Sequence, residues 1–171
     1  MIDKMRARDL MVAGFFRTAQ EGLGVGIQVL GVNHLGLAAK DPEKCRWFLR
    51  EALGLTHLGD ELVKSQKTMT AMFQASDAHA AQTRLEIVSP EVGTTDGPIS
   101  RYIEKKGGGI HHLAVTVADV AMAITHLKSL SVKMIDEVPR SGAHQTKIAF
   151  VHPESTGGIL IELVEESKNH R

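Results

Sequence analysis

The sequence predicts an α+β domain in which two βαβββ modules follow each other and form one curved mixed sheet around a cleft. The main observation is an internal repeat. Val32–Asp41 and Ile110–Asp119 share the same order of apolar and polar residues, a His-Leu pair, and an Asp seven residues after the His. Three strand-like segments follow each copy, and 171 residues suit two such modules around a shared core.

Each copy of the repeat is typical of a strand that leads into a helix. Asp41 and Asp119 belong to the residue types favoured at helix N-caps, and Pro42 stands at the first helical position. The spacing of the apolar residues then predicts helices over Pro42–Leu53 and Val120–Leu130.

Short alternating segments predict three more strands in each module. They are Thr56–Lys64, Lys67–Ala75 and Gln82–Ser89 in the first, and Val132–Val138, Thr146–His152 and Gly158–Val164 in the second. A linker with a short helix at Pro98–Lys106 joins the modules. We therefore expect one domain over residues 30–166, with modules at 30–92 and 108–166 and a tail at 167–171.

Residues 1–29 form an N-terminal extension that we expect to be helical. Apolar residues such as Met5 and Phe15 mix with Arg6 and Arg8, as in an amphipathic helix that docks on the domain or on a partner subunit. An Arg-rich start also occurs in transit peptides, although the acidic residues here count against one. The expected location is cytoplasmic, with the mitochondrial matrix as the alternative if residues 1–26 act as a transit peptide.

Composition excludes several classes of function. Twenty basic and twenty acidic residues give a formal net charge of zero, so neither nucleic acid nor a membrane surface is an expected partner. No apolar run approaches the roughly 20 residues of a spanning helix. Cys45 is the single cysteine, which excludes an intrachain disulfide and fits a reducing compartment.

The repeat also duplicates four residues that can bind a metal. His34 and His112 stand at matching places in the first strand of each module, and Glu86 and Glu162 stand in the last strands. A carboxylate in an apolar strand is costly unless it has a partner or faces solvent. Each residue alone is more often structural or exposed, but four at matching places favour one shared metal site.

Two imidazoles and two carboxylates suit one divalent ion of borderline softness, and Co²⁺, Zn²⁺, Ni²⁺ and Mn²⁺ all fit this donor set. Structural zinc sites are usually closed and rich in cysteine, so the set is typical of a catalytic centre. His111 competes with His112 as the ligand. The repeat favours His112, because His111 aligns with Asn33, and strict strand alternation would place His111 on the opposite face.

Several segments resemble the vicinal-oxygen-chelate superfamily and, within it, the methylmalonyl-CoA epimerases. They are Val32–Ala38, Gly97–Gly107, Gly109–Val115, Ile135–His144 and His152–Leu163. The resemblance covers residues 30–166 and implies a glyoxalase-like fold with a metal in its cleft. The metal positions of the family fall on His34, Glu86, His112 and Glu162.

The resemblance implies an enzyme that interconverts (2R)- and (2S)-methylmalonyl-CoA through a metal-stabilised enolate, with an acyl-CoA as its ligand and a homodimer as its assembly. It implies Glu162 as one acid/base group, and the symmetry of the repeat adds Glu86 as the second. Some epimerases have a glutamate on the third strand for this role, but Lys67–Phe73 contains no carboxylate here. Water or another side chain is the alternative to Glu86.

Two other functions remain open at this point. A glyoxalase I-like lactoylglutathione lyase uses the same four ligands, and His152–Gly158 argues against it. A non-catalytic ligand-sequestering protein of the superfamily generally lacks the metal ligands. Basic residues are candidates for contacts to the CoA phosphates, namely Lys64, Lys67, Arg101, Lys105, Lys106, Arg140 and Lys147.

Overall fold

The computed structural model describes residues 26–75 and 83–167. Residues 1–25 of the expected N-terminal helix lie outside these residues, as does most of the expected tail. The described end of the extension is not helical, since residues 26–28 have no regular structure and a strand begins at Val29. Among the residues described, no helix has the length and apolar character needed to cross a membrane.

In its described residues, the first module contains four strands, one helical segment and a 3₁₀ turn at Lys64–Gln66. The strands and the helix are β1 (Val29–Ala38), α2 (Pro42–Trp47), β2 (Thr56–Val63), β3 (Thr68–Gln74) and β4 (Arg84–Pro90). The predicted helix is present, but its second half, Phe48–Ala52, is wound as a π-helix. The Asp41 side chain accepts a hydrogen bond from Lys44 N at 2.9 Å, which confirms the predicted N-cap.

The second module repeats this order after a linker helix. Its elements are α3 (Pro98–Lys106), β5 (Gly109–Val117), α4 (Val120–Ser129), β6 (Arg140–Ser141), β7 (Lys147–Val151) and β8 (Ile161–Glu165), with one 3₁₀ turn at Ala143–Gln145 and another at Pro153–Ser155. The Asp119 side chain caps α4 by accepting from Met122 N at 2.8 Å.

One predicted strand, Val132–Val138, is wrong. The structure has only a single bridge there, between Met134 and Val151, and a two-residue strand further on. The Asp136 side chain accepts the Phe150 N–H at 2.8 Å, a hydrogen bond that a strand carbonyl would otherwise accept. Two of the apolar residues in this segment are also not covered, since Ile135 is 49% and Val138 is 69% exposed.

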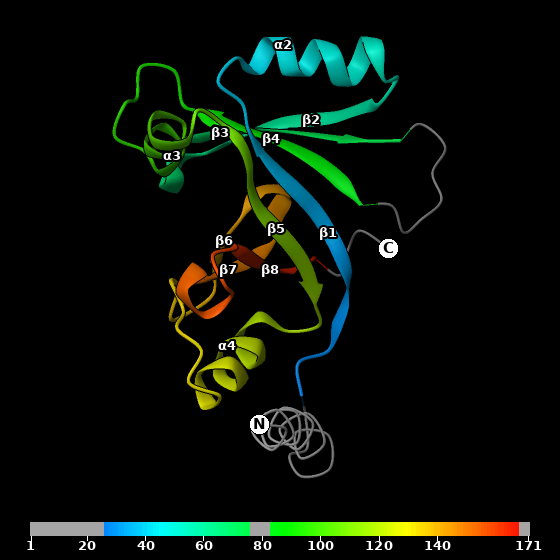
Figure 1. Cartoon of the computed structure of the whole chain (residues 1–171). Helices are drawn as coiled ribbons and strands as arrows, with labels where there is room; N and C mark the ends of the chain where they lie inside the picture. Colours follow the sequence, from blue (N-terminus) through cyan, green and yellow to red (C-terminus); the bar gives the residue numbers. More distant parts are fainter. Residues whose placement is uncertain (1–25, 76–82, 168–171) are drawn as a thin grey trace, which may run out of the picture.

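All eight strands form one curved sheet in the order β2-β3-β4-β1-β5-β8-β7-β6, as expected for two fused modules (Figure 1). The two first strands, β1 and β5, pair antiparallel in the middle. In each module the last strand is parallel to the first, so β4 lies beside β1 and β8 beside β5. The four strands that carry the predicted ligands are therefore neighbours at the centre of the sheet.

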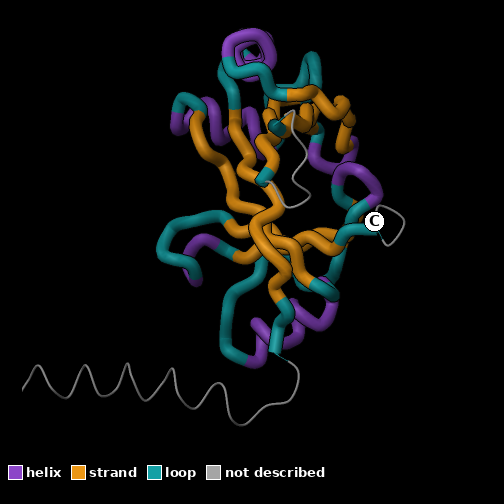
Figure 2. The backbone as a smooth tube through the Cα atoms, turned by 90° about the vertical axis from the view of Figure 1, so that its right-hand side faces the viewer, coloured by secondary structure: helices purple, strands orange, loops and turns teal. Residues whose placement is uncertain are grey.

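The apolar core lies in separate clusters between the sheet and its helices. Buried Leu49 packs with Ala71, Phe73 and Ile87 under the first helix. The α4 helix covers the other module through a second cluster: Val117, Val120, Ala123, Ile124, Met134, Ala149, Val151 and Leu163. Figure 2 shows the strands as one continuous bent layer with helices outside it. The cavity on the concave side carries both polar and apolar side chains, and the apolar ones include Met72, Ile148, Phe150 and Val164.

Candidate metal centre

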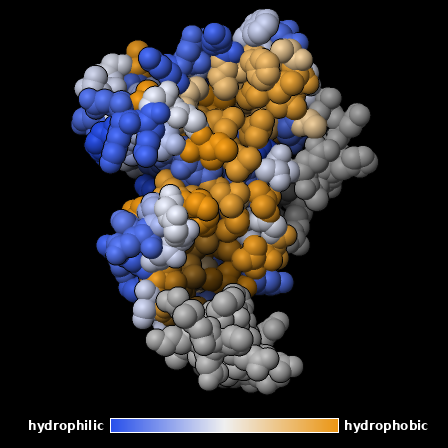
Figure 3. Space-filling view, viewed as in Figure 1, coloured by the Kyte–Doolittle hydropathy of each residue, from blue (hydrophilic) through white to orange (hydrophobic). Residues whose placement is uncertain are grey.

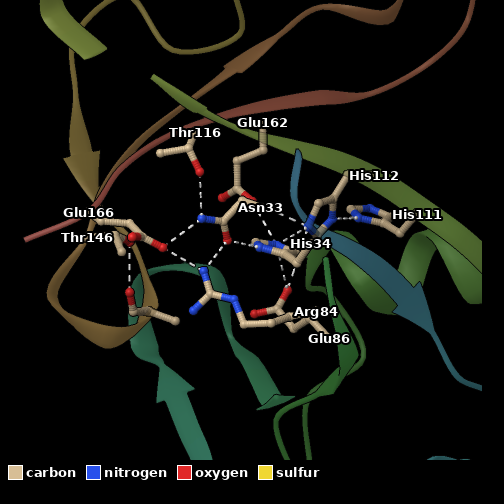
Figure 4. A network of polar contacts seen from close by, with 11 residues as sticks. Asn33, His34, Arg84, Glu86, His111, His112, Thr116, Thr146, Glu162 and Glu166 are labelled. Atoms are coloured by element: carbon tan, nitrogen blue, oxygen red, sulfur yellow. Dashed lines mark hydrogen bonds and ion pairs between the residues drawn. The ribbon is translucent and has the colours of Figure 1, made fainter. Parts of the chain in front are cut away.

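Four buried side chains meet at the middle of the sheet (Figure 4). His34 comes from β1, Glu86 from β4, His112 from β5 and Glu162 from β8. Each is at most 6% exposed. The cavity that they line is shared with residues of both modules, among them Thr70 and Phe150.

The donor atoms of the four residues lie close together. The two imidazole Nε2 atoms are 3.0 Å apart. Glu162 Oε2 lies 3.2 Å from the His34 Nε2 and 3.3 Å from the His112 Nε2. Glu86 Oε2 lies 3.5 and 3.6 Å from the same two nitrogens. The sequence therefore predicted correctly which four side chains converge.

These distances fit a shared ion. Metal–ligand bonds of about 2.0–2.2 Å place neighbouring donors at about 3 Å in an octahedron and slightly further apart in a tetrahedron. The ligand atoms of His34, Glu86 and His112 all lie within 4.8 Å of one another. Glu162 joins them through its contacts to both imidazoles. Two nitrogen and two carboxylate donors suit a divalent ion of the borderline class.

Without an ion, the carboxylates hold a proton on the imidazole of His34. Burial by itself lowers the pKa of His34, but hydrogen bonds to Glu162 and Glu86 and their negative charges outweigh it and raise this pKa to about 9. Burial by itself raises the pKa of Glu162, and the contacts with His112 and His34 lower it to about 2. The cluster is therefore a strong binding site for positive charge.

Two β-bulges point extra side chains toward this site. In the pairing of β1 with β5, Val32 faces Val115 and His34 faces Ala114, so Asn33 has no partner residue. In the same ladder, Gly36 faces His112 and Leu37 faces Ile110, which leaves His111 as the extra residue. A bulge breaks the alternation of side chains along a strand. The expectation that His111 points away from His112 is therefore wrong.

Both extra residues contact the imidazole that follows them. Asn33 Oδ1 lies 2.8 Å from the Nδ1 of His34, and His111 Nδ1 lies 3.0 Å from the Nδ1 of His112. An acceptor at Nδ1 places the ring proton there and leaves Nε2 free to bind a metal. Burial and the neighbouring His112 lower the pKa of His111 to about 4, so this ring is neutral and can accept.

Asn33 is itself held by a polar network that the sequence did not indicate (Figure 4). Its Oδ1 accepts from Arg84 at 2.7 Å, and its Nδ2 donates to Thr116 Oγ1 and to Glu166, each at 2.9 Å. Arg84 also donates to Glu166 at 2.6 Å. Arg84 stands two residues before Glu86 in the same strand, and such residues share one face of a sheet. This spacing is the sequence signal that could have placed Arg84 on the cavity face.

The residues predicted to contact CoA phosphates do not join the cavity of the four ligands. In the described part of the chain, Lys67 pairs with Asp96 and Lys147 with Glu165 on the surface. The β3 strand contributes Thr68, Thr70 and Met72 to the cavity wall instead of a carboxylate. The loop of residues 141–145, which the sequence places at the cleft, brings His144 to this cavity from the 3₁₀ turn after β6, although no role for this residue was predicted from the sequence.

Fold and site together define a class of two-module domains with a buried cluster of side chains positioned to hold a metal. Comparison with known families agrees. Residues 33–150 match the model of the Glyoxalase/Bleomycin resistance protein/Dioxygenase superfamily, and the chain belongs to this family. The predicted glyoxalase-like fold is thereby confirmed.

Several individual proteins are similar to this chain over most of its length. The uncharacterized protein YqjC of Bacillus subtilis is 37% identical, over 78% of this chain and 91% of its own. Mitochondrial methylmalonyl-CoA epimerase of Bos taurus is 31% identical, over 77% of this chain and 72% of its own. A Streptomyces coelicolor methylmalonyl-CoA epimerase variant in complex with 2-nitronate-propionyl-CoA is 27% identical with a TM-score of 0.74, and the match covers 80% of this chain and 94% of that one.

Proposed function

We propose that the protein is an epimerase that interconverts (2R)- and (2S)-methylmalonyl-CoA by proton transfer at C2. The observation that carries this proposal is the buried cluster of two imidazoles and two carboxylates, with both modules contributing one of each. The named epimerases among the relatives supply the substrate class. The C2 proton of this substrate lies between a thioester and a carboxylate, which makes it the most acidic carbon-bound proton of the acyl group.

We propose that His34, Glu86, His112 and Glu162 hold one divalent ion, with Co²⁺, Zn²⁺, Ni²⁺ and Mn²⁺ as the candidates. When bound, such an ion stabilises negative charge that develops on the thioester oxygen. The chain itself orients the imidazoles through Asn33 and His111 and buries the site on the concave side of the sheet.

Epimerisation removes a proton from one face of C2 and returns one to the other, so two acid/base groups are needed. We propose Glu162 as one of them. Its carboxylate reaches the centre from β8, and its contacts to both imidazoles hold it in place. By the symmetry of the two modules, we propose Glu86 as the second group. Its carboxylate approaches the Nε2 atoms of His34 and His112 from β4.

We also propose that the protein acts as a homodimer on an acyl-CoA. An apolar band runs along the face on which β1 and β5 lie (Figure 3). Val29, Leu30, Val32 and Ile110 are between 47% and 64% exposed in these strands. Exposed apolar patches of this kind mark interaction surfaces. The cytoplasm is the proposed compartment.

The decisive test is proton NMR of methylmalonyl-CoA in D₂O with protein loaded with each candidate metal. We expect the C2 proton signal to disappear and both epimers to form, with chelated protein inactive. The hemithioacetal of methylglyoxal and glutathione is assayed with the same samples. Formation of lactoylglutathione without C2 exchange would replace the epimerase proposal with the lyase. No ion bound and neither reaction would favour ligand sequestration.

A further inference from the structure

A second imidazole–carboxylate pair joins the two edges of the sheet. The strand order places β2 and β6 at opposite ends. Curvature nevertheless brings the turn after β6 onto β2, where the backbone N–H of His144 donates to Glu61 Oε2 at 2.6 Å. Glu61 belongs to the first module and His144 to the second, so this contact closes the cavity between them.

The His144 ring has one nitrogen held and one nitrogen without a partner. Its Nδ1 lies 3.5 Å from the same Glu61 Oε2. Its Nε2 is buried and has no hydrogen-bond partner among the residues that the structure describes. Leaving such a buried atom unpaired is unfavourable. Because His144 lines the cavity of the four candidate ligands, a molecule in that cavity is the natural partner of Nε2.

The backbone holds His144 in a strained position. His144 has φ 54° and ψ 36°, and Gln145 also has a positive φ of 59°. Two consecutive residues other than glycine in the left-handed region are unfavourable, and such strain concentrates at functional sites. Hydrogen bonds close the turn on both sides, from Gly142 N to Thr146 O at 3.0 Å and from Thr146 N to Ala143 O at 3.2 Å. The ring is therefore placed by the fold.

We propose that His144, in place of Glu86, is the acid/base group for the second face of C2, and that Glu61 is its positioning residue. This inference rests on the proposed epimerase function. Glu86 lies within 3.6 Å of both imidazole nitrogens of the cluster, whereas the Nε2 of His144 has no hydrogen-bond partner among the described residues. In the sheet, Glu61 lies opposite Thr70, within the β3 segment that has no carboxylate. A carboxylate is thus present next to that position on the neighbouring strand.

The proton transfers balance. A carboxylate beside Nδ1 favours the ring form with the proton on Nδ1 and the lone pair on Nε2. Nε2 takes the C2 proton, the C–H electron pair passes into the thioester as an enolate, and the new imidazolium faces Glu61. Glu162, which is ionised at rest, relays a proton from a solvent water to the other face of C2. The hydroxide that is left takes the proton of His144, so the water and both groups are restored.

The test follows C2 exchange in D₂O from each purified epimer separately, using metal-loaded full-length protein. His144→Asn removes the base and keeps a residue type that tolerates the left-handed conformation. Glu86→Gln is measured in parallel. The matched control is His57→Asn, because His57 forms a similar pair with Asp60 at 2.8 Å on β2 without lining the cavity. Metal content and thermal midpoint are recorded for every variant.

We expect H144N to lose exchange from one epimer by about 100-fold or more, with exchange from the other within tenfold of wild type and metal content unchanged. H57N should exchange both epimers at the wild-type rate. Equal losses from both epimers in H144N, or a one-sided loss in E86Q instead, would overturn the assignment. Absence of exchange in the wild type with all four metals overturns the epimerase function itself, which is a separate result.

Glu61→Gln gives a second readout that a purely structural role would not move. Without this carboxylate, the Nδ1 side of the His144 ring loses its charged neighbour on β2, and Nε2 is held less well toward the cavity. Exchange from the epimer that His144 deprotonates should therefore fall about tenfold in E61Q, while exchange from the other epimer and the metal content stay unchanged. Equal exchange from that epimer in E61Q and wild type would show that Glu61 does not position the base.

Discussion

At the residue scale, the most informative contact is the one behind each candidate ligand. Asn33 and His111 take corresponding places at Nδ1 of His34 and His112, yet only the ligands themselves could be predicted from the sequence. The repeat identified His34 and His112 because both precede a leucine. It could not show the function of Asn33 and His111, because a bulge changes which face a side chain takes without leaving a sequence pattern.

Replacing Asn33 tests this contact. Asn33→Leu removes the acceptor at Nδ1 of His34, so the ring no longer has a fixed proton position. We expect metal affinity to fall by about 10–100-fold, measured by competition with a chelating dye. Thr116→Val is the control, since it removes a different contact of Asn33 and leaves the acceptor intact. An equal affinity for N33L and wild type would contradict the role of Asn33.

The ion pairs of His34 predict how metal-free stability depends on pH. Its pKa rises from 6.5 to about 9 on folding, so the stabilisation is complete below pH 6.5 and is lost as the pH rises through 9. We expect the thermal midpoint of chelated protein to fall by about 5 °C across this window through this group. His34→Gln should lack this component of the fall. An identical pH dependence of both proteins would show that His34 is not protonated in the metal-free cluster.

At the scale of elements, β1 and β5 pair antiparallel, and each strand has a small residue opposite the histidine of the other. Gly36 on β1 faces His112, and Ala114 on β5 faces His34. A Cβ on Gly36 would lie 2.1 Å from the His112 ring. The repeat predicted both strands and both helix caps correctly. The strand prediction for Val132–Val138 is wrong because its apolar residues follow a pattern typical of strands. In the structure the Asp136 side chain, and not a strand carbonyl, accepts the hydrogen bond from Phe150 N.

Gly36→Ala therefore displaces an imidazole with a single methyl group. We expect the variant to fold but to bind metal at least tenfold more weakly, because the His112 ring must move by more than an ångström. Isothermal titration of the metal-free protein measures this. The control is Gly26→Ala, where an added Cβ meets nothing within 4 Å. Unchanged metal binding in G36A would argue against His112 as a ligand.

At the scale of the whole molecule, the two modules share one sheet and leave an apolar band on the face of β1 and β5 (Figure 3). The curvature of the sheet could not be predicted from the sequence. It brings Glu61 and His144 together from opposite edges, although they are far apart in the chain. Residue patterns identify strands and their order within each module, whereas contacts across the closed edge depend on the twist of all eight strands.

The apolar band predicts the assembly. Light scattering should give about twice the chain mass of 18.6 kDa for the wild type. Leu30→Glu places a charge in the band and should give the monomer mass, because burying an unpaired carboxylate is unfavourable. Val92→Glu, at a 97% exposed position outside β1 and β5, should stay dimeric. A monomeric wild type would contradict the proposed homodimer.

We propose that one ion joins both halves of the chain. Anomalous diffraction from crystals of cobalt-loaded protein shows where the ion lies. We expect one peak per chain, within bonding distance of His34, Glu86, His112 and Glu162. A peak bound by residues of one module alone, or full cobalt loading with no peak at this position, would contradict it.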